Sequence, residues 1–103
     1  MSREITSAEI RLWLIADGIY ANKKGFEPLV RAIDIYRRGQ PIMKIYHAVQ
    51  EEFQVSSERL LIKNLQGAIC TSKARRKMEK KSVGAYVAMV RTVLESTETQ
   101  TNN

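Results

Sequence analysis

Three hydrogen-bonding side chains share one face of a helix that the stretch FQVSSERLLIKNLQGAI, residues 53–69, predicts. Arg59, Lys63 and Gln66 follow one another at spacings of four and three residues, which places them on the same side of an α-helix. Arginine and lysine can donate to the acceptors on a guanine edge, and glutamine can pair with the two groups on an adenine edge. Gly67 lies beside them and has no side chain to obstruct a close approach. The face is therefore suited to reading bases in the major groove of DNA.

The opposite face of the same helix is apolar. Its stripe consists of Leu61, Leu65, Ala68 and Ile69. Ile62 lies at the edge of this stripe, and we expect the whole stripe to face a hydrophobic core. The helix is predicted over residues 57–71, with Ser56 or Ser57 as its N-terminal cap. Ser57, at the entry of the helix, joins the candidate DNA-binding residues.

A second amphipathic helix is predicted directly before this one, over residues 42–53, because apolar side chains repeat there at helical spacing. Gln54 and Val55 then form a tight corner. Two helices joined by so short a corner are typical of a helix-turn-helix. That motif prefers a small residue where this chain has Gln50.

Positive charge is concentrated in and after the candidate recognition helix. Residues 59–81 hold eight lysines and arginines against the lone Glu79, a net charge of +7 in a chain whose total is +6. The part that follows the helix, called here the basic flank, consists of Lys73, Arg75, Arg76, Lys77, Lys80 and Lys81. It is a candidate for contacts with DNA phosphates, above all Lys73, Arg75, Arg76 and Lys77. The alternative is a solvated, flexible connector.

The rest of the chain predicts further helices and no strand. One helix is expected after a cap at Ser7 and ends at Gly18, and another spans residues 26–38. A last helix is expected over residues 82–94, whereas residues 72–81 are predicted as a loop or a frayed helix. The sequence therefore predicts an all-α bundle of about five to six helices. We expect one domain, residues 1–95, and a disordered tail, residues 96–103, because that tail has low hydrophobicity.

Composition excludes several other classes of protein. The chain has 103 residues, and its apolar content of 44% suffices for one small core. Its apolar runs are too short to cross a membrane, and its first residues lack the apolar stretch of a secretory signal. The single cysteine, Cys70, cannot form an internal disulfide, which favours a cytoplasmic protein.

No pattern of residues predicts an enzyme, a metal site or a bound cofactor. His47 is expected on the exposed side of its helix, where we expect no catalytic role. Cys70 has no histidine near it in the sequence, and we expect it to be a partly buried structural residue at a helix end.

Three stretches carry a resemblance to a known family. IADGIYANKKGFEPLVRAI, residues 15–33, resembles the opening of the DNA-binding effector domain of the stage-zero sporulation response regulator of endospore-forming bacteria. The matching residues are Gly18, Lys24, Gly25, Phe26, Leu29, Arg31, Ala32 and Ile33. The likeness continues through IMKIYHAVQEEFQ, residues 42–54, and returns at YVAMV, residues 86–90. In all it covers roughly residues 10–94.

The resemblance implies an all-α domain that binds promoter DNA through a helix-turn-helix. It further implies contact with RNA polymerase and the binding of a homodimer to tandem sites. In this family a phosphorylatable receiver precedes the effector domain, whereas here only a few residues precede the first helix. We therefore expect a stand-alone domain that takes no phosphoryl signal in that way.

The recognition helix departs from the family pattern, and one extra residue is needed to align it. Arg59 matches the first arginine of the family, whereas Lys63 and Gln66 replace the second and third arginines and Gly67 replaces a histidine. Lysine cannot make the paired hydrogen bonds that arginine makes to one guanine, so we expect a different target sequence. The alternative is an interaction module that keeps the fold and modulates a related regulator without reading DNA.

Overall fold

The computed structural model describes residues 5–100, and within them every regular element is helical, which confirms the predicted all-α bundle. The helices are α1 (Ser7–Ala16), α2 (Phe26–Arg37), α3 (Ile42–Glu52), α4 (Glu58–Ile69), α5 (Lys73–Arg76) and α6 (Val83–Gln100). None of them is long and apolar enough to cross a membrane.

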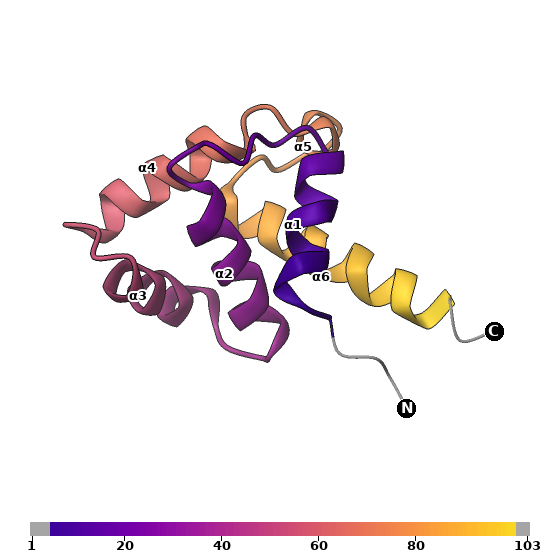
Figure 1. Cartoon of the computed structure of the whole chain (residues 1–103), viewed down its shortest axis with the longest axis horizontal. Helices are drawn as coiled ribbons and strands as arrows, with labels where there is room; N and C mark the ends of the chain where they lie inside the picture. Colours follow the sequence, from indigo (N-terminus) through magenta and orange to yellow (C-terminus); the bar gives the residue numbers. More distant parts are fainter. Residues whose placement is uncertain (1–4, 101–103) are drawn as a thin grey trace.

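Helix α2 lies at the centre of the bundle and packs against α1, α3, α4 and α6 (Figure 1). Its buried side includes Phe26, Leu29 and Ile33. The fully buried side chains around it come from every long helix, among them Ile10 and Leu14 of α1, Ile45 and Val49 of α3, and Tyr86, Val87 and Val90 of α6. Each large apolar side chain removed from water in this way contributes about 1.5–3 kcal/mol.

The helix starts agree with the predicted ones to within a residue, but the first cap differs. Thr6, not Ser7, caps α1, because its hydroxyl accepts a hydrogen bond from the Glu9 N–H at 3.2 Å. Ser57 caps α4 as predicted, and its Oγ accepts from the Leu60 N–H at 3.1 Å. At the other end of the chain, α6 continues past residue 94, where we expected it to stop, to Gln100. The last part of the predicted tail, residues 101–103, lies outside the described residues.

The corner between α3 and α4 ends α3 with paired backbone hydrogen bonds. The Val55 N–H donates to the Gln50 carbonyl at 3.0 Å, and the Gln54 N–H donates to the Glu51 carbonyl at 3.2 Å. Gln54 adopts the left-handed conformation that this ending requires, with φ 54°. The Gln50 side chain then donates to the Val55 carbonyl at 3.2 Å, which explains why a long amide stands where a small residue is usual.

A carboxylate at the end of α1 joins three parts of the chain. The Asp17 side chain accepts hydrogen bonds from the Ser72 hydroxyl, from the Ala74 N–H at 2.9 Å and from the Tyr86 hydroxyl at 2.8 Å. Its backbone carbonyl accepts from the Lys73 N–H at 2.9 Å. These contacts, called here the Asp17 hub, attach the start of α5 and the first turn of α6 to the end of α1.

Two glycines allow the α1–α2 loop to approach α4 and its continuation closely. Gly18 has φ +97°, and a Cβ added there would lie 2.8 Å from the Thr71 carbonyl oxygen. A Cβ on Gly25 would lie 2.1 Å from the Asn64 carbonyl oxygen. Any side chain at position 25 would therefore push the loop away from α4.

Burial of the Tyr86 side chain, followed by its hydrogen bond to the Asp17 carboxylate, raises the pKa of this tyrosine above its ordinary value of 10.0. A tyrosine whose pKa is raised by folding stabilises the fold fully below its unfolded pKa, and this contribution is lost as the pH rises above it. We therefore expect the free energy of unfolding to fall above about pH 10.

Tyr86→Phe should lower stability at neutral pH by about 1.5–3 kcal/mol, the range for a hydrogen bond to a charged group. It should also make the alkaline fall shallower, because the ionising group is gone. Some slope should persist, since burial raises the pKa of Tyr46 as well. Urea unfolding at a series of alkaline pH values measures both effects, with Tyr20→Phe, an exposed tyrosine, as the control. An unchanged alkaline slope in Tyr86→Phe would contradict this account of the hub.

Candidate nucleic-acid interface

Helix α4 presents the polar face that its sequence predicts. Arg59, Lys63, Gln66 and Gly67 are all exposed, as is the cap Ser57. The buried side of α4 consists of Leu61, Leu65, Ala68 and Ile69, each with 0% exposure, while Ile62 is half-buried at its edge. The assignment of the two faces is therefore confirmed.

A shallow hollow of about 710 Å³ runs along the outward side of α4. It is lined by Ser57, Arg59, Leu60, Ile62, Lys63 and Gln66. A Cβ added at Gly67 would meet no atom within 4 Å, so this position is open to an approaching ligand. The hollow therefore combines hydrogen-bonding groups with apolar side chains on one exposed surface.

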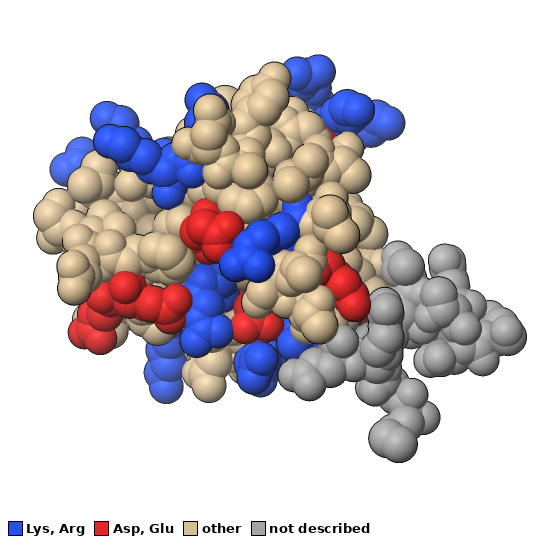
Figure 2. All heavy atoms as spheres, viewed as in Figure 1, with Lys and Arg blue, Asp and Glu red and all other residues tan. Residues whose placement is uncertain are grey.

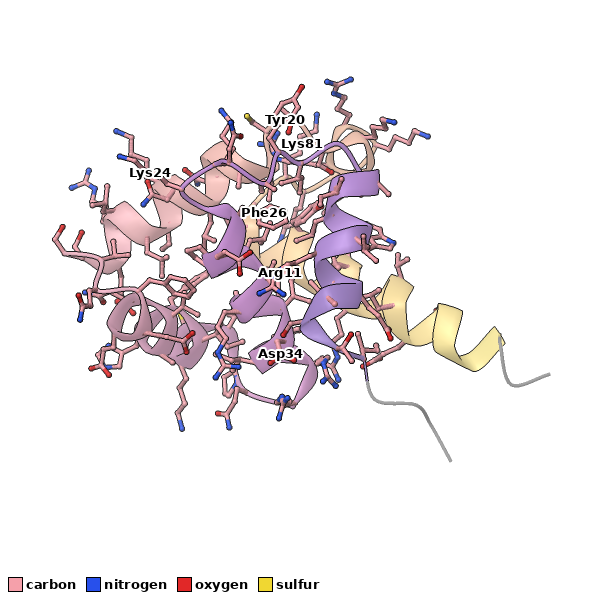
Figure 3. All side chains as sticks on the ribbon, viewed as in Figure 1. Arg11, Tyr20, Lys24, Phe26, Asp34 and Lys81 are labelled. Carbon is pink, nitrogen blue, oxygen red and sulfur yellow. The ribbon has the colours of Figure 1, made fainter. Side chains whose placement is uncertain are left out.

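A second hollow, of about 260 Å³, lies between α4 and the α1–α2 loop. It is lined by Lys23, Lys24, Gly25, Lys63, Asn64, Gly67 and Ala68. The loop thus brings Lys23 and Lys24 beside Lys63, and Figure 3 shows Lys24 next to α4. Lys23 and Lys24 were not among the predicted DNA-binding residues, because lysines at the end of a helix are commonly explained by solvation alone. The signal that could have found them is the adjoining Gly25, because glycine permits close contact between backbones.

The basic flank is partly folded into a short helix. Ser72, itself fully buried, caps α5 by accepting from the Arg75 N–H at 2.9 Å, and the Asp17 hub holds the first turn in place. Lys73, Arg76 and Lys77 are exposed. An unstructured connector therefore does not describe this part of the chain.

Arg75 differs from the other predicted phosphate partners because it is half-buried. Its Nε donates to the Lys81 carbonyl at 3.1 Å, which closes the loop that follows α5. One of its guanidinium donors thus has a structural role, so the exposed cations of the flank are better placed than Arg75 to meet a ligand.

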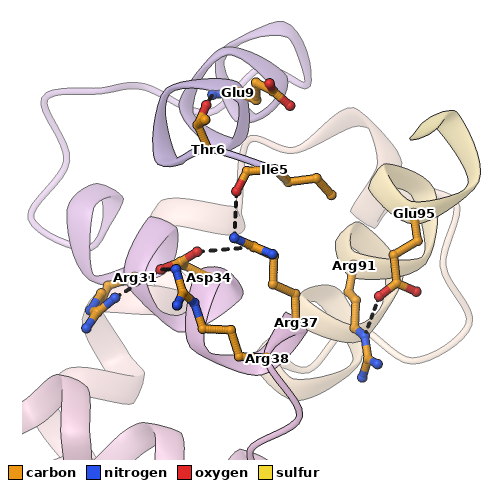
Figure 4. A network of polar contacts seen from close by, with 9 residues as sticks. All are labelled: Ile5, Thr6, Glu9, Arg31, Asp34, Arg37, Arg38, Arg91 and Glu95. Carbon is orange, nitrogen blue, oxygen red and sulfur yellow. Dashed lines mark hydrogen bonds and ion pairs between the residues drawn. The ribbon is translucent and has the colours of Figure 1, made fainter. Parts of the chain in front are cut away.

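Ion pairing divides the described arginines into two groups. Every arginine that the structure describes outside residues 59–81 has a carboxylate partner: Arg11 pairs with Glu27, Arg31 with Asp34 and Glu52, Arg37 and Arg38 with Asp34, and Arg91 with Glu95. Figure 4 shows the three arginines around Asp34 and the separate Arg91 pair. Within the described residues, Arg59, Arg75 and Arg76 have no ion pair.

The division concerns arginines alone, because no lysine that the structure describes forms an ion pair, including Lys44 of α3. Among the residues that the structure describes, Lys23, Lys24 and Lys63 form no ion pair, and neither do Lys73 and Lys77. Figure 2 shows Lys and Arg side chains at the upper left, over α4 and the neighbouring loop, and at the upper right, over α5. Asp and Glu side chains lie lower in the same view, among further Lys and Arg side chains and including a group over α3. Uncompensated positive charge therefore flanks α4.

The other residues considered for chemistry, His47 and Cys70, contact different partners. His47 lies 3.0 Å from Glu51, and both side chains are largely exposed. Cys70 is exposed rather than partly buried, which corrects the expectation from sequence, and its thiol donates to the Gly67 carbonyl. In the part of the chain with described side chains, no group of three or more His, Cys, Asp or Glu residues could hold a metal ion.

Comparison of the chain with protein-family models, with curated proteins and with solved structures finds no match.

Proposed function

We propose that this chain is a cytoplasmic DNA-binding regulator of transcription that places α4 in the major groove of duplex DNA. The observation that carries the proposal is the division of the arginines into two groups. The described arginines elsewhere are paired with carboxylates, whereas the arginines on and beside α4 have no carboxylate partner among the described residues. The resemblance of the sequence to the effector domain of the sporulation regulator supports the same function.

In this proposal α3 and α4 act as a helix-turn-helix. Helix α3 crosses behind α4, and the corner with its left-handed Gln54 sets the angle between them. Arg59, Lys63 and Gln66 then meet base edges, the two cations at guanine acceptors and the amide at adenine. Gly67 leaves the helix backbone open to the groove wall. Ser57 caps the end of α4 that enters the groove first.

The phosphates on either side of the groove are contacted by two separate groups of cations. Lys23 and Lys24 reach one strand from the α1–α2 loop, beside Lys63. Lys73, Arg76 and Lys77 reach the backbone from α5 and the residue after it. Such contacts fix the register of a protein on DNA without reading its sequence. By the family resemblance, two copies bind tandem sites and contact RNA polymerase.

A second candidate is a protein-interaction module that has kept the fold without base readout. It is favoured by the apolar outward side of α1, where Leu12 is 68% and Ile15 is 50% exposed. It is also favoured by the replacement of the family's recognition residues at positions 63, 66 and 67. A pure adaptor has no need of uncompensated cations around α4, so the salt dependence of DNA binding separates the two functions.

Alanine at Arg59, Lys63 or Gln66 is expected to reduce discrimination by about 1–3 kcal/mol at the base pair that the residue contacts. The fold should be unaffected, because all three side chains are exposed. The measurement is the affinity of each variant for a site selected from random duplexes and for its single-base-pair variants. Arg38→Ala, on the far end of α2, is the control. If the triple variant kept both affinity and sequence preference, α4 would not be the reading helix.

Neutralising Lys73, Arg76 and Lys77 together is expected to weaken binding to selected and random duplexes alike. The dependence of log affinity on log salt should also become flatter, by about 0.9 for each phosphate that the variant no longer neutralises. Arg75 is left unchanged in this variant because its Nε holds the Lys81 carbonyl.

A matched variant neutralises Arg11, Arg38 and Arg91, each of which is ion-paired away from α4. It removes the same total charge and should leave the salt slope nearly unchanged, because these arginines lie away from the proposed phosphate contacts. The variant should also remain folded, since exposed ion pairs contribute little to stability. Equal slopes in the two variants would show that net charge, rather than a located phosphate contact, governs binding.

A further inference from the structure

A leucine stands exposed on the helix proposed to read DNA. Leu60 is 41% exposed, although α4 has a fully buried side filled by Leu61, Leu65, Ala68 and Ile69. The core therefore leaves a large part of Leu60 exposed to solvent. Its backbone N–H is held by the Ser57 cap, so the side chain leaves the helix from the first turn at a defined place. Exposing a leucine in water has no benefit to the free protein.

The surroundings of Leu60 indicate what covers it. Leu60 lines the same hollow as Arg59, Lys63 and Gln66, so a ligand that pairs with those three groups also approaches the leucine. In the major groove the base edges carry hydrogen-bond donors and acceptors and one kind of apolar group, the C5-methyl of thymine. An aliphatic side chain in that groove gains only from contact with such a methyl group.

We infer that Leu60 contacts the C5-methyl group of a thymine in the DNA target, so that thymine is selected over the other bases at that position. The inference rests on the proposed function and adds to it the identity of one base and the atom by which it is recognised. Readout of this kind is independent of the hydrogen bonds made by Arg59, Lys63 and Gln66.

The test uses a duplex selected by the full chain from a random pool, with each thymine in turn replaced by deoxyuridine. This replacement removes the methyl group and keeps every hydrogen-bonding group of the base. Burial of one methyl group predicts that binding weakens by roughly three- to tenfold at one position. Leu60→Ala should bind the thymine and deoxyuridine duplexes equally well at that position. Leu12→Ala, at a more exposed leucine on α1, should discriminate between them like the unchanged chain.

The outcomes separate this inference from the proposed function. If no duplex sequence is enriched and binding is absent, both fail. If a site is enriched and depends on Arg59, Lys63 and Gln66, but no deoxyuridine replacement weakens binding, the thymine contact alone is wrong. If Leu60→Ala still discriminates thymine from deoxyuridine, another side chain makes the contact, and the assignment to Leu60 is overturned. Thermal unfolding of Leu60→Ala checks that the variant is folded at the temperature of the binding assay.

Discussion

The carboxylate of Asp17 is the point on which the arrangement of the proposed interface depends. It accepts hydrogen bonds from a fully buried tyrosine of α6, from the fully buried Ser72 and from the Ala74 N–H in the first turn of α5. Hydrogen bonds to a charged acceptor contribute about 1.5–3 kcal/mol each, more than neutral ones. Because α5 begins only four residues after α4 ends, the hub determines where the cations of α5 lie relative to the recognition face. Without it, these cations would follow α4 on an unanchored chain.

In the described part of the chain, arginines at the end of α2 are paired with carboxylates, unlike those on and beside α4. Asp34 is only 4% exposed and lies within 3.6 Å of the guanidinium groups of Arg31, Arg37 and Arg38. Arg37 donates in addition to the Ile5 carbonyl at 2.6 Å, which ties the N-terminal segment to α2. Positive charge is thereby partly compensated at the end of α2, whereas the arginines on and beside α4 have no carboxylate partner among the described residues. A potential distributed in this way orients the molecule toward a polyanion before any base is contacted.

Local signals sufficed to predict most helices, and tertiary contacts account for the differences. Apolar spacing placed α2, α3 and α4 to within about two residues at each end and assigned both faces of α4, because periodicity depends only on which side is buried. No local pattern indicates that Asp17 meets Ser72 and Tyr86, which lie 55 and 69 residues away in the chain. Lys23 and Lys24 likewise lie beside Lys63 because the α1–α2 loop touches α4. That contact requires a glycine at position 25. The cap at Thr6 was missed because Ser7, an equally good capping residue, follows it.

The central claim is that duplex DNA binds to the α4 face, and backbone amide NMR shifts recorded during a titration with a selected duplex test it most directly. The account predicts shift changes along α4, in the α1–α2 loop around Lys23 and Lys24, and in α5, and their absence along the outward side of α1 at Leu12 and Ile15. The changes should weaken together as salt is raised. Shift changes confined to α1, or an unperturbed α4 at saturating duplex, would contradict it.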